Sequence, residues 1–231
     1  MIEEPALLTI RRDIRRPPPE KVAAFQNVPT GFVVDAMQGG GALAAAIKPL
    51  PMLDASSSIA GPALTAGCGP GDILATLASL RFIEPGDIVV AAFAGHQGCA
   101  AIGDSIAGMA KNAGAAGFVT DGPARDSKGI LDTGLPLWCS GLTPASPHST
   151  GPGTVGLAIQ IGGQQVDAGD IIVADSDGVV VVPFEQIDVV IERLARISDI
   201  EAKRDAAVAD GMQIPEDISA LLESDAVRYV N

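Results

Sequence analysis

Apolar positions along the chain follow two kinds of spacing, which predict strands and helices in turn. Short β-branched runs bounded by turn residues are typical of buried strands, and they occur at residues 88–93, 117–120, 155–161, 171–174 and 178–183. Ala- and Leu-rich stretches predict helices at residues 22–37, 74–80, 105–112 and 187–207. Strand–helix–strand alternation followed by a strand-rich second half predicts an α/β fold with α/β or α/β/β layers.

One turn sequence precedes three of these elements. Pro70-Gly71-Asp72, Pro85-Gly86-Asp87 and Ala168-Gly169-Asp170 each lead directly into an apolar run. Glycine can take the positive φ of a tight turn, and the aspartate side chain can accept a hydrogen bond from nearby backbone. We therefore expect the first turn to begin a helix, with Asp72 near its start, and the other two to begin buried strands.

The distribution of proline and of helical periodicity divides the chain into three parts. Residues 1–19 mix arginine with proline and predict an extended N-terminal arm. Residues 20–210 predict one compact domain, which ends in an amphipathic C-terminal helix, and residues 211–231 form a tail. A chain of 231 residues is the right size for one such domain with appendages.

Composition excludes several classes of partner. Aromatic residues make up only 3% of the chain and the net charge is −13, which disfavours base stacking and repels phosphate backbones and anionic membranes. No apolar run approaches the roughly 20 residues of a membrane span, and the three cysteines have no disulfide or zinc spacing. We therefore expect a soluble cytoplasmic protein with neither a nucleic-acid nor a membrane partner.

Two segments carry the candidate chemistry. Gly103-Asp104-Ser105-Ile106 lies at a predicted turn into a helix, where free backbone amides can hold a carboxylate. Arg125 and Asp126 follow a predicted strand, and ligand sites of α/β sheets collect at strand ends. Arginine offers a planar fork for a carboxylate, and aspartate offers hard oxygen to Mg²⁺ or Mn²⁺.

The spacing of these residues resembles a family signature. Asp104, twenty further residues and then Arg125-Asp126 is similar to the D-X20-R-D signature of the RraA-like class II pyruvate aldolases. Flanking segments resemble family landmarks in their usual order, at residues 58–65, 84–90, 117–122 and 168–180. The resemblance covers roughly residues 20–210 and implies a layered α/β/β fold assembled as homotrimers or homohexamers, with active sites between subunits.

The resemblance also implies a role for each site residue. Asp126 would hold the divalent metal, Mg²⁺ or Mn²⁺, and Arg125 would bind the substrate's oxygens. Asp104 would orient a water on that metal. Glu201, in the C-terminal helix of a neighbouring subunit, is a candidate contact to the metal's water shell, with an exposed helical charge as the alternative. The amides expected to bind the substrate carboxylate are those of Gly103, Asp104, Ser105 and Ile106.

Two functions remain open at this point. Family enzymes cleave 4-hydroxy-4-methyl-2-oxoglutarate or 4-carboxy-4-hydroxy-2-oxoadipate to pyruvate and a second oxo acid, and can decarboxylate oxaloacetate. The alternative is a regulatory protein similar to those RraA proteins that bind and inhibit the endoribonuclease RNase E, which share the fold. A pure binding module does not need Asp104, Arg125 and Asp126 together, so their presence favours the carbon–carbon lyase.

The chain departs from the family pattern at one position. The aldolase signature often continues R-D-X2-E/D, whereas Gly129 stands here in place of the acid and Asp132 is the nearest carboxylate. This departure puts the particular substrate in doubt. No lysine is placed for a Schiff base, since Lys128 is the nearest and lies in a predicted turn.

Three further residues have both a chemical and a simpler interpretation. His96 could carry a proton on the approach to the site, but an exposed loop residue is the simpler interpretation, as it is for His148. Cys99 could be a nucleophile, but no motif pairs it with a base. A small buried side chain is therefore the simpler interpretation of Cys99.

Overall fold

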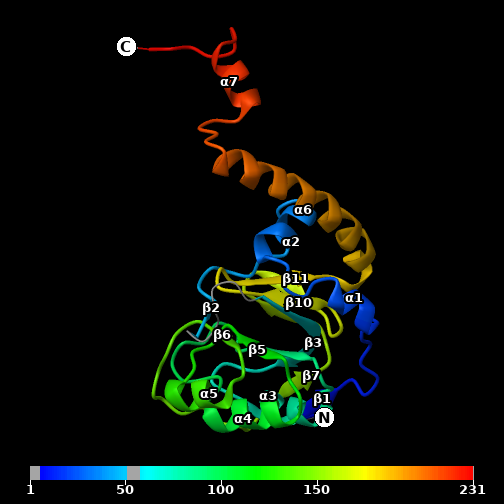
Figure 1. Ribbon diagram of the computed structural model, residues 1–231. Coiled ribbons are helices and arrows are strands. Elements are labelled where there is room, and N and C mark those ends of the chain that lie inside the picture. Colours follow the sequence, from blue (N-terminus) through cyan, green and yellow to red (C-terminus); the bar gives the residue numbers. More distant parts are fainter. Residues whose placement is uncertain (1–5, 51–57, 231) are drawn as a thin grey trace, which may run out of the picture.

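The computed structural model describes residues 6–50 and 58–230 and has the layered α/β architecture expected from the sequence (Figure 1). The first five residues of the expected arm and the last residue of the expected tail lie outside this description. The strands are β1 (Leu8–Ile10), β2 (Lys48–Pro49), β3 (Ile59–Gly67), β4 (Ile88–Ala92), β5 (Gly117–Thr120), β6 (Leu137–Cys139), β7 (Gly153–Val155), β8 (Ile159–Ile161), β9 (Gln164–Val166), β10 (Ile171–Ala174) and β11 (Val179–Val182). The α-helices are α1 (Pro19–Ala23), α2 (Thr30–Ala36), α3 (Leu74–Ser79), α4 (Asp104–Asn112), α5 (Ser127–Thr133), α6 (Ile187–Ala209) and α7 (Glu216–Leu222).

The sheet is organised around the long strand β3. Its first half pairs antiparallel with β10, and its second half pairs parallel with β4, so one strand links two layers. Strands β3, β4, β5 and β6 run parallel, while β7 pairs antiparallel with the end of β3. The parallel strands place their carboxyl ends at one edge, which is where ligand sites form in such sheets.

Strands that are apolar at every position bury both of their faces. In β4, Val89 and Ala91 pack toward α4, whereas Ile88 and Val90 pack toward β11 and its neighbours. In β11, alternate valines likewise face the sheet on one side and helices α2 and α6 on the other. Helices α3, α4 and α5 cover the outer face of the parallel strands, and α2 and α6 cover the β10–β11 layer (Figure 1). Because successive residues point to opposite faces, unbroken apolar runs require this layering.

The three expected turns form as predicted. Gly71, Gly86 and Gly169 have φ values of 76°, 96° and 96°, which favour glycine. The aspartates that follow them are buried, and each accepts backbone hydrogen bonds, such as Leu74 N to Asp72 Oδ1 at 2.7 Å. The first turn leads into α3 and the other two lead into β4 and β10, as the sequence predicts.

Two predicted elements are divided in the structure. The helix expected over residues 22–37 is interrupted between α1 and α2, where Asn27 has a φ of 59° and Pro29 immediately precedes α2. Proline disfavours helical backbone in the residue before it, which accounts for the break. The strand expected over residues 155–161 is divided into β7 and β8, because Gly156, with a φ of 74°, turns the chain between them.

The N-terminal arm contributes a strand and a buried ion pair. Strand β1 pairs parallel with β7, and downstream of it Arg16 reaches Asp87 in the turn before β4. Both carboxylate oxygens of Asp87 accept from Arg16, at 2.9 Å from Nε and 2.7 Å from Nη2. The Asp87 side chain is only 2% exposed, so this bidentate pair fixes the arm to the domain.

Arg16→Ala is expected to lower the free energy of unfolding by about 3 kcal/mol, because removing one partner leaves a buried carboxylate uncompensated. Urea unfolding at neutral pH measures this change. Arg196→Ala is the matched control, since Arg196 pairs with Glu192 on an exposed helix face and should lower it by less than about 1 kcal/mol. Equal losses in the two variants would contradict the assigned role of Arg16.

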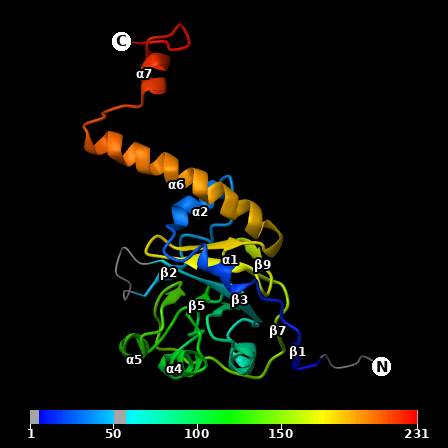
Figure 2. The same ribbon diagram turned by 45° about the vertical axis from the view of Figure 1, so that its right-hand side comes forward.

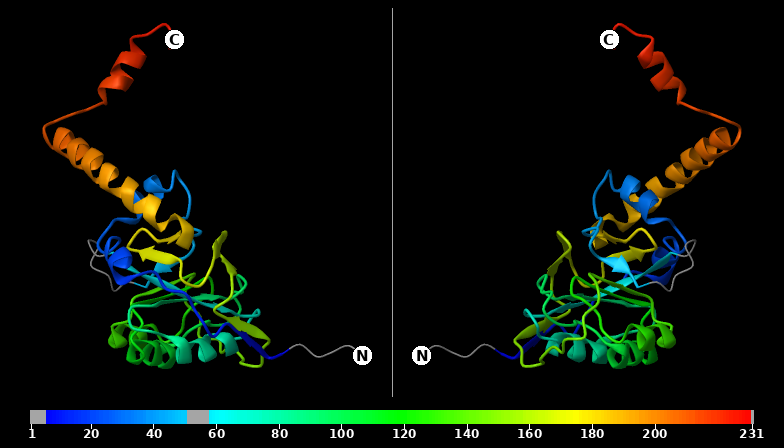
Figure 3. Two further views of the ribbon diagram at one scale, coloured as in Figure 1. Left: turned by 90° about the vertical axis from the view of Figure 1, so that its right-hand side faces the viewer. Right: turned by 90° about the vertical axis from the view of Figure 1, so that its left-hand side faces the viewer.

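The C-terminal helices extend away from the layered body. Helix α6 begins against α2, where Val190 and Leu194 are buried, and then continues beyond the body to α7 (Figures 2 and 3). Its second half and α7 carry large apolar side chains that are exposed, including Ile200, Val208 and Leu221. Within residues 6–50 and 58–230, no helix is long and apolar enough to cross a membrane.

Candidate active site

The loops after β4 and β5 bring the sequence-predicted residues together. These strands are parallel neighbours, so the loops that leave their carboxyl ends run side by side. The backbones of the two loops then pair as well: Arg125 N donates to Ile102 O at 3.0 Å, and Ala101 N donates to Pro123 O at 2.7 Å. Residues that are far apart in the sequence are thereby fixed at one edge of the sheet.

Asp121 ties the two loops together from the other side. Its Oδ1 accepts from Phe93 N at 2.5 Å and its Oδ2 accepts from Gly95 N at 2.8 Å. Both donors lie in the loop after β4, whereas Asp121 directly follows β5. This carboxylate therefore supports the site's shape, a role that the sequence analysis did not assign to it.

Arg125 and Asp126 lie directly over Gly103. A Cβ atom on Gly103 would be 3.1 Å from both Arg125 Nε and Asp126 Oδ2, so a side chain there would crowd both groups. The two charged side chains also contact each other, with Nε and Oδ2 3.3 Å apart. Arg125 is held from the far side by Ser146, whose Oγ lies 2.7 Å from Nη1. Ser146 is a contact that no sequence motif indicated.

The backbone of Asp126 adopts an uncommon conformation. Its φ and ψ are 56° and 43°, in the left-handed region, and the residue precedes the first turn of α5 without capping it through its side chain. Non-glycine residues in this region cost of order 1 kcal/mol and cluster at functional sites. The conformation leaves the carboxylate about half exposed and available for a ligand.

Asp104 packs against the position where the family acid is missing. A Cβ atom on Gly129 would lie 2.7 Å from both Cβ and Oδ2 of Asp104. Gly129 therefore leaves room that Asp104 occupies, and no larger residue fits at position 129 without moving Asp104. The glycine that replaces the family acid therefore affects where Asp104, a candidate catalytic residue, can lie.

The start of α4 offers backbone donors to the site. The first amides of a helix lack intrahelical acceptors, but Ser105 N already donates to Asp104 Oδ1 at 2.6 Å. Within the described part of the chain, the amides of Asp104 and Ile106 donate to no protein acceptor. Of the four expected amides, that of Ser105 is thus used internally. A small cavity of about 40 Å³ lies here, lined by residues that include Ile73, Ala100, Gly103, Asp104, Arg125 and Pro147.

The donor set fits a magnesium-like ion rather than a structural metal. Among residues 6–50 and 58–230, no group of three or more histidine, cysteine or acidic side chains is arranged to hold a metal. Mg²⁺ commonly keeps several waters and binds through one or two carboxylates together with substrate oxygens. The half-exposed carboxylate of Asp126 could supply one such ligand, with waters and substrate oxygens as the others.

The remaining candidates lie in different places. Cys99 is buried, as its simpler interpretation predicts, and His96 is partly exposed in the loop after β4. Lys128 lies in α5 rather than in a turn, with its side chain 90% exposed and paired with Asp132. Glu201 pairs with Arg204 on α6, which is at the opposite end of the molecule from α4 and α5 (Figure 1). A chain's own Glu201 is therefore remote from its own candidate site.

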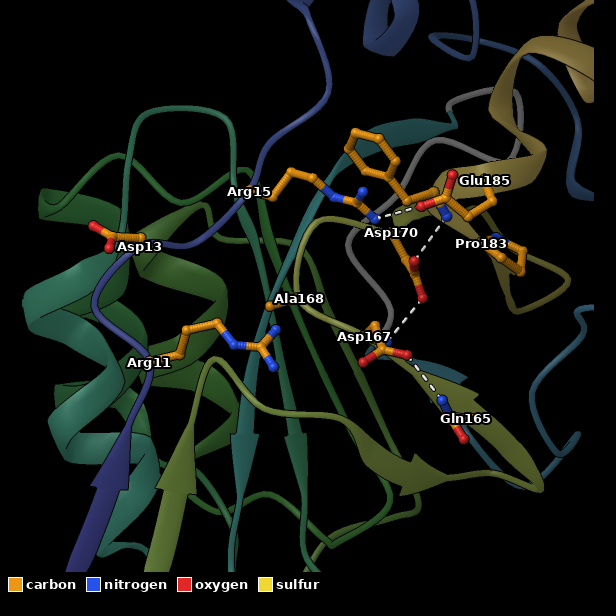
Figure 4. Close-up of a pocket in the computed structure, with 10 residues that line it drawn as sticks. Arg11, Asp13, Arg15, Gln165, Asp167, Ala168, Asp170, Pro183 and Glu185 are labelled. Atoms are coloured by element: carbon orange, nitrogen blue, oxygen red, sulfur yellow. Dashed lines mark hydrogen bonds and ion pairs between the residues drawn. The ribbon is translucent and has the colours of Figure 1, made fainter.

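A larger cavity, about 370 Å³, lies away from these residues, beside the N-terminal arm (Figure 4). Its charged residues are Arg11, Asp13, Arg15, Asp167, Asp170 and Glu185. Arg15 pairs with Glu185 at 2.9 Å and stacks on Phe184, while Asp170 accepts from backbone amides. Acidic groups outnumber basic ones here, so an anionic substrate is not favoured.

An Asp–His pair that the sequence analysis did not predict lies near the site. His148 Nδ1 is 2.9 Å from Oδ2 of the buried Asp72. Burial alone would raise the pKa of Asp72, but hydrogen bonds from the amides of Leu74, Thr150 and Gly151 and from His148 outweigh it and lower the pKa to about 2. In the sequence, only the turn motif drew attention to Asp72, by predicting it near the start of a helix.

Asp72 should make stability depend on pH. Its pKa is about 2 in the folded protein against 3.8 for a free side chain, so its contribution is fully present above about pH 4 and disappears as the pH falls through 2. This shift in pKa corresponds to a contribution of about 2 kcal/mol to the free energy of unfolding. Urea unfolding of the parent and of Asp72→Asn should show a stability gap at pH 6 that narrows by that amount near pH 2. A gap independent of pH would contradict the assignment.

Comparison with known proteins gives consistent matches. A model of the RraA-like family, described as Aldolase/RraA, matches residues 30–181. A protein of Halalkalibacterium halodurans named "Putative 4-hydroxy-4-methyl-2-oxoglutarate aldolase" is 35% identical over 191 residues, which cover 83% of this chain and 90% of that protein.

Solved structures show the same fold. An uncharacterized protein from Pseudomonas syringae superposes with a TM-score of 0.74 at 23% identity, covering 86% of this chain and 96% of that one. Streptomyces coelicolor RraAS2, described as an unusual member of the RNase ES inhibitor RraA protein family, gives a TM-score of 0.70 at 27% identity. The match covers 84% of this chain and 100% of that chain.

Proposed function

The chain belongs to the RraA-like family, and on that premise we propose that it is a divalent-metal-dependent carbon–carbon lyase. Its reaction would be the cleavage of a 4-hydroxy-2-oxo acid to pyruvate and a second oxo acid, with decarboxylation of oxaloacetate as a related activity. The observation that carries the proposal is the convergence of Arg125 and Asp126 on Gly103, at the start of α4.

Each residue has a chemical role in this proposal. The free amides of Asp104 and Ile106 would bind the substrate's carboxylate, which the helix start also favours electrostatically. The guanidinium of Arg125, anchored by Ser146, would hold the 2-oxo group, where negative charge develops as the carbon–carbon bond breaks. Asp104 would accept hydrogen bonds from the reacting part of the substrate and its water.

A divalent cation, Mg²⁺ or Mn²⁺, would be held by Asp126 and would supply the Lewis acid for this cleavage. Asp126 supports this role because its carboxylate is about half exposed and is not used to cap α5. Lys128 does not suit a Schiff base, because its side chain is 90% exposed and Asp132 raises the pKa of its amine, whereas such a lysine needs a lowered pKa.

The proposal is tested by measuring pyruvate release from a panel of 4-hydroxy-2-oxo acids and oxaloacetate in the presence of Mg²⁺ or Mn²⁺. We expect at least one compound to be cleaved, with no substrate trapped on the protein after borohydride reduction. Trapping on a lysine would exclude the metal-assisted route, and no release from any compound would exclude the lyase.

A regulatory function is the second candidate, supported by the match to RraAS2. It requires direct binding to an RNase E-type enzyme and inhibition of RNA cleavage. Such binding should survive Arg125→Lys and Asp126→Asn, because the lyase site is not needed for it. Inhibition without pyruvate release would favour this function over the lyase.

We expect the chain to assemble as a homotrimer or homohexamer. The exposed apolar residues of α6 and α7, which extend from the body, support packing against a second copy (Figure 2). Light scattering at micromolar concentration should show three or six subunits, and truncation after residue 197 should weaken the assembly. Full activity in a monomer would contradict this expectation, and with it any role for a neighbour's Glu201 at the metal.

A further inference from the structure

Both histidines of the chain come together beside Gly71, in segments whose neighbouring residues Ile73 and Pro147 line the cavity at the start of α4. A Cβ atom on Gly71 would lie 3.4 Å from His148 Nε2, 3.6 Å from His96 Nε2 and 3.6 Å from Cys99 Sγ. These atoms belong to two loops, one carrying His96 and Cys99 and the other carrying His148, and they surround one glycine whose φ is 76°. A Cβ atom there would make only ordinary contacts with these side chains, so the positive φ is what favours glycine at position 71.

His148 is oriented, whereas His96 is not. Asp72 is 3% exposed and has a pKa of about 2, so its carboxylate is ionised and can only accept hydrogen bonds. The hydrogen on His148 must then be on Nδ1, which leaves the Nε2 lone pair free to take a proton. The ring of His96 lies edge-on to Phe93 and makes no hydrogen bond to the described residues.

The loop that carries His148 also lines the candidate site. Ser146, which anchors Arg125, lies two residues before His148, and Pro147 lines the cavity at the start of α4. Two backbone hydrogen bonds fix the loop against the turn at Gly71: Ile73 N to His148 O at 2.9 Å and His148 N to Gly71 O at 3.0 Å. Arg125 and His148 are thus held by one short segment.

We propose that His148, oriented by Asp72, is the proton-transfer residue of the candidate active site. This inference rests on the proposed function and names the group that handles its proton. Nε2 takes the proton of the substrate's C4 hydroxyl, directly or through one water. The C3–C4 bond breaks, its electron pair goes to C3, and C4 becomes a carbonyl. The imidazolium then returns the proton to C3, which gives pyruvate and restores the neutral ring.

Asp72 is a positioning residue in this scheme, because it acts only through His148. Its carboxylate fixes the tautomer and also holds the loop by accepting from Thr150 N at 2.6 Å and Gly151 N at 2.7 Å. The groups that face the imidazole are Asp72, the Thr150 hydroxyl, His96 and Cys99. Cys99 is not required by the scheme.

The test uses His148→Asn and the matched variant His96→Asn in the full-length protein. Asparagine can still donate to Asp72 but has no equivalent of Nε2, so the loop is kept while the base is lost. We expect His148→Asn to lower kcat by about 10²-fold, with KM nearly unchanged. Added imidazole should restore part of the rate, and His96→Asn should stay within about threefold of the parent.

Two further measurements separate a chemical role from a structural one. In D₂O, the parent should exchange the methyl hydrogens of pyruvate, and His148→Asn should do so about 10²-fold more slowly. With only two histidines, ¹⁵N spectra of the metal-free protein should show His148 protonated at Nδ1, and Asp72→Asn should shift it toward a mixture of tautomers. Wild-type turnover and exchange in His148→Asn would overturn this inference alone. A parent that neither releases pyruvate nor exchanges its hydrogens would overturn the lyase and this inference together.

Discussion

Asp126→Asn is expected to weaken binding of Mg²⁺ or Mn²⁺ strongly and to lower kcat by roughly 10²–10³-fold, with only part of the rate recovered by excess metal. The carboxylate is the anionic ligand in the proposed site, and the neutral amide keeps its size but not its charge. Because the side chain is about half exposed and does not cap α5, the fold should be unaffected.

Arg125→Lys is the companion variant, because it should impair the same reaction by removing a substrate contact rather than a metal ligand. Lysine keeps the positive charge but cannot reproduce the planar fork that contacts Ser146 and the substrate. The rate should fall to a similar extent while metal affinity, measured by calorimetry, stays near that of the parent. Equal turnover in the parent and both variants would show that the site is assigned wrongly.

Gly129→Ala is expected to lower kcat by about 10²-fold, although alanine is the better helix former. The added Cβ would lie 2.7 Å from Cβ and Oδ2 of Asp104, so Asp104 must move from its place beside the start of α4. Gly129→Asp, which restores the acid of the family signature, should be at least as harmful here, since its side chain is larger.

Gly108→Ala is the matched control for this prediction. Gly108 lies inside α4, and a Cβ atom there would meet only Thr133 Cγ2 at 3.9 Å, which is ordinary contact. We expect this variant to keep its activity and to gain up to about 1 kcal/mol in stability from helix propensity. If Gly129→Ala behaves in the same way as Gly108→Ala, the coupling between Gly129 and Asp104 is absent.

The strands β4, β5, β10 and β11 could be predicted from the sequence, whereas β3 and β6 of the parallel sheet were not predicted. The runs that form β4, β10 and β11 are apolar at every position because both of their faces are buried, and such runs strongly indicate buried strands. The three Gly-Asp turns were equally clear, since positive φ and a short acidic acceptor leave few alternatives. The family signature then indicated Asp104, Arg125 and Asp126 as candidate site residues, which remains a prediction.

The elements that were missed depend on contacts distant in the sequence. Strand β1 exists because β7 is beside it, and the polar hairpin strand β9 exists because it pairs with β8. The Asp72–His148 pair likewise joins two loops that no local pattern connects. The consequence of a glycine at position 129 could not be predicted from the sequence either, because the contact between Gly129 and Asp104 is seen only in the structure.

Metal dependence of pyruvate release is the most direct test of the proposed lyase. The parent protein, given a substrate that it cleaves, should lose activity in excess chelator and regain it on addition of Mg²⁺ or Mn²⁺, with one ion bound per subunit. Asp126→Asn should fail to regain full activity at the same free metal concentration. Undiminished pyruvate release in excess chelator would contradict a metal-dependent lyase.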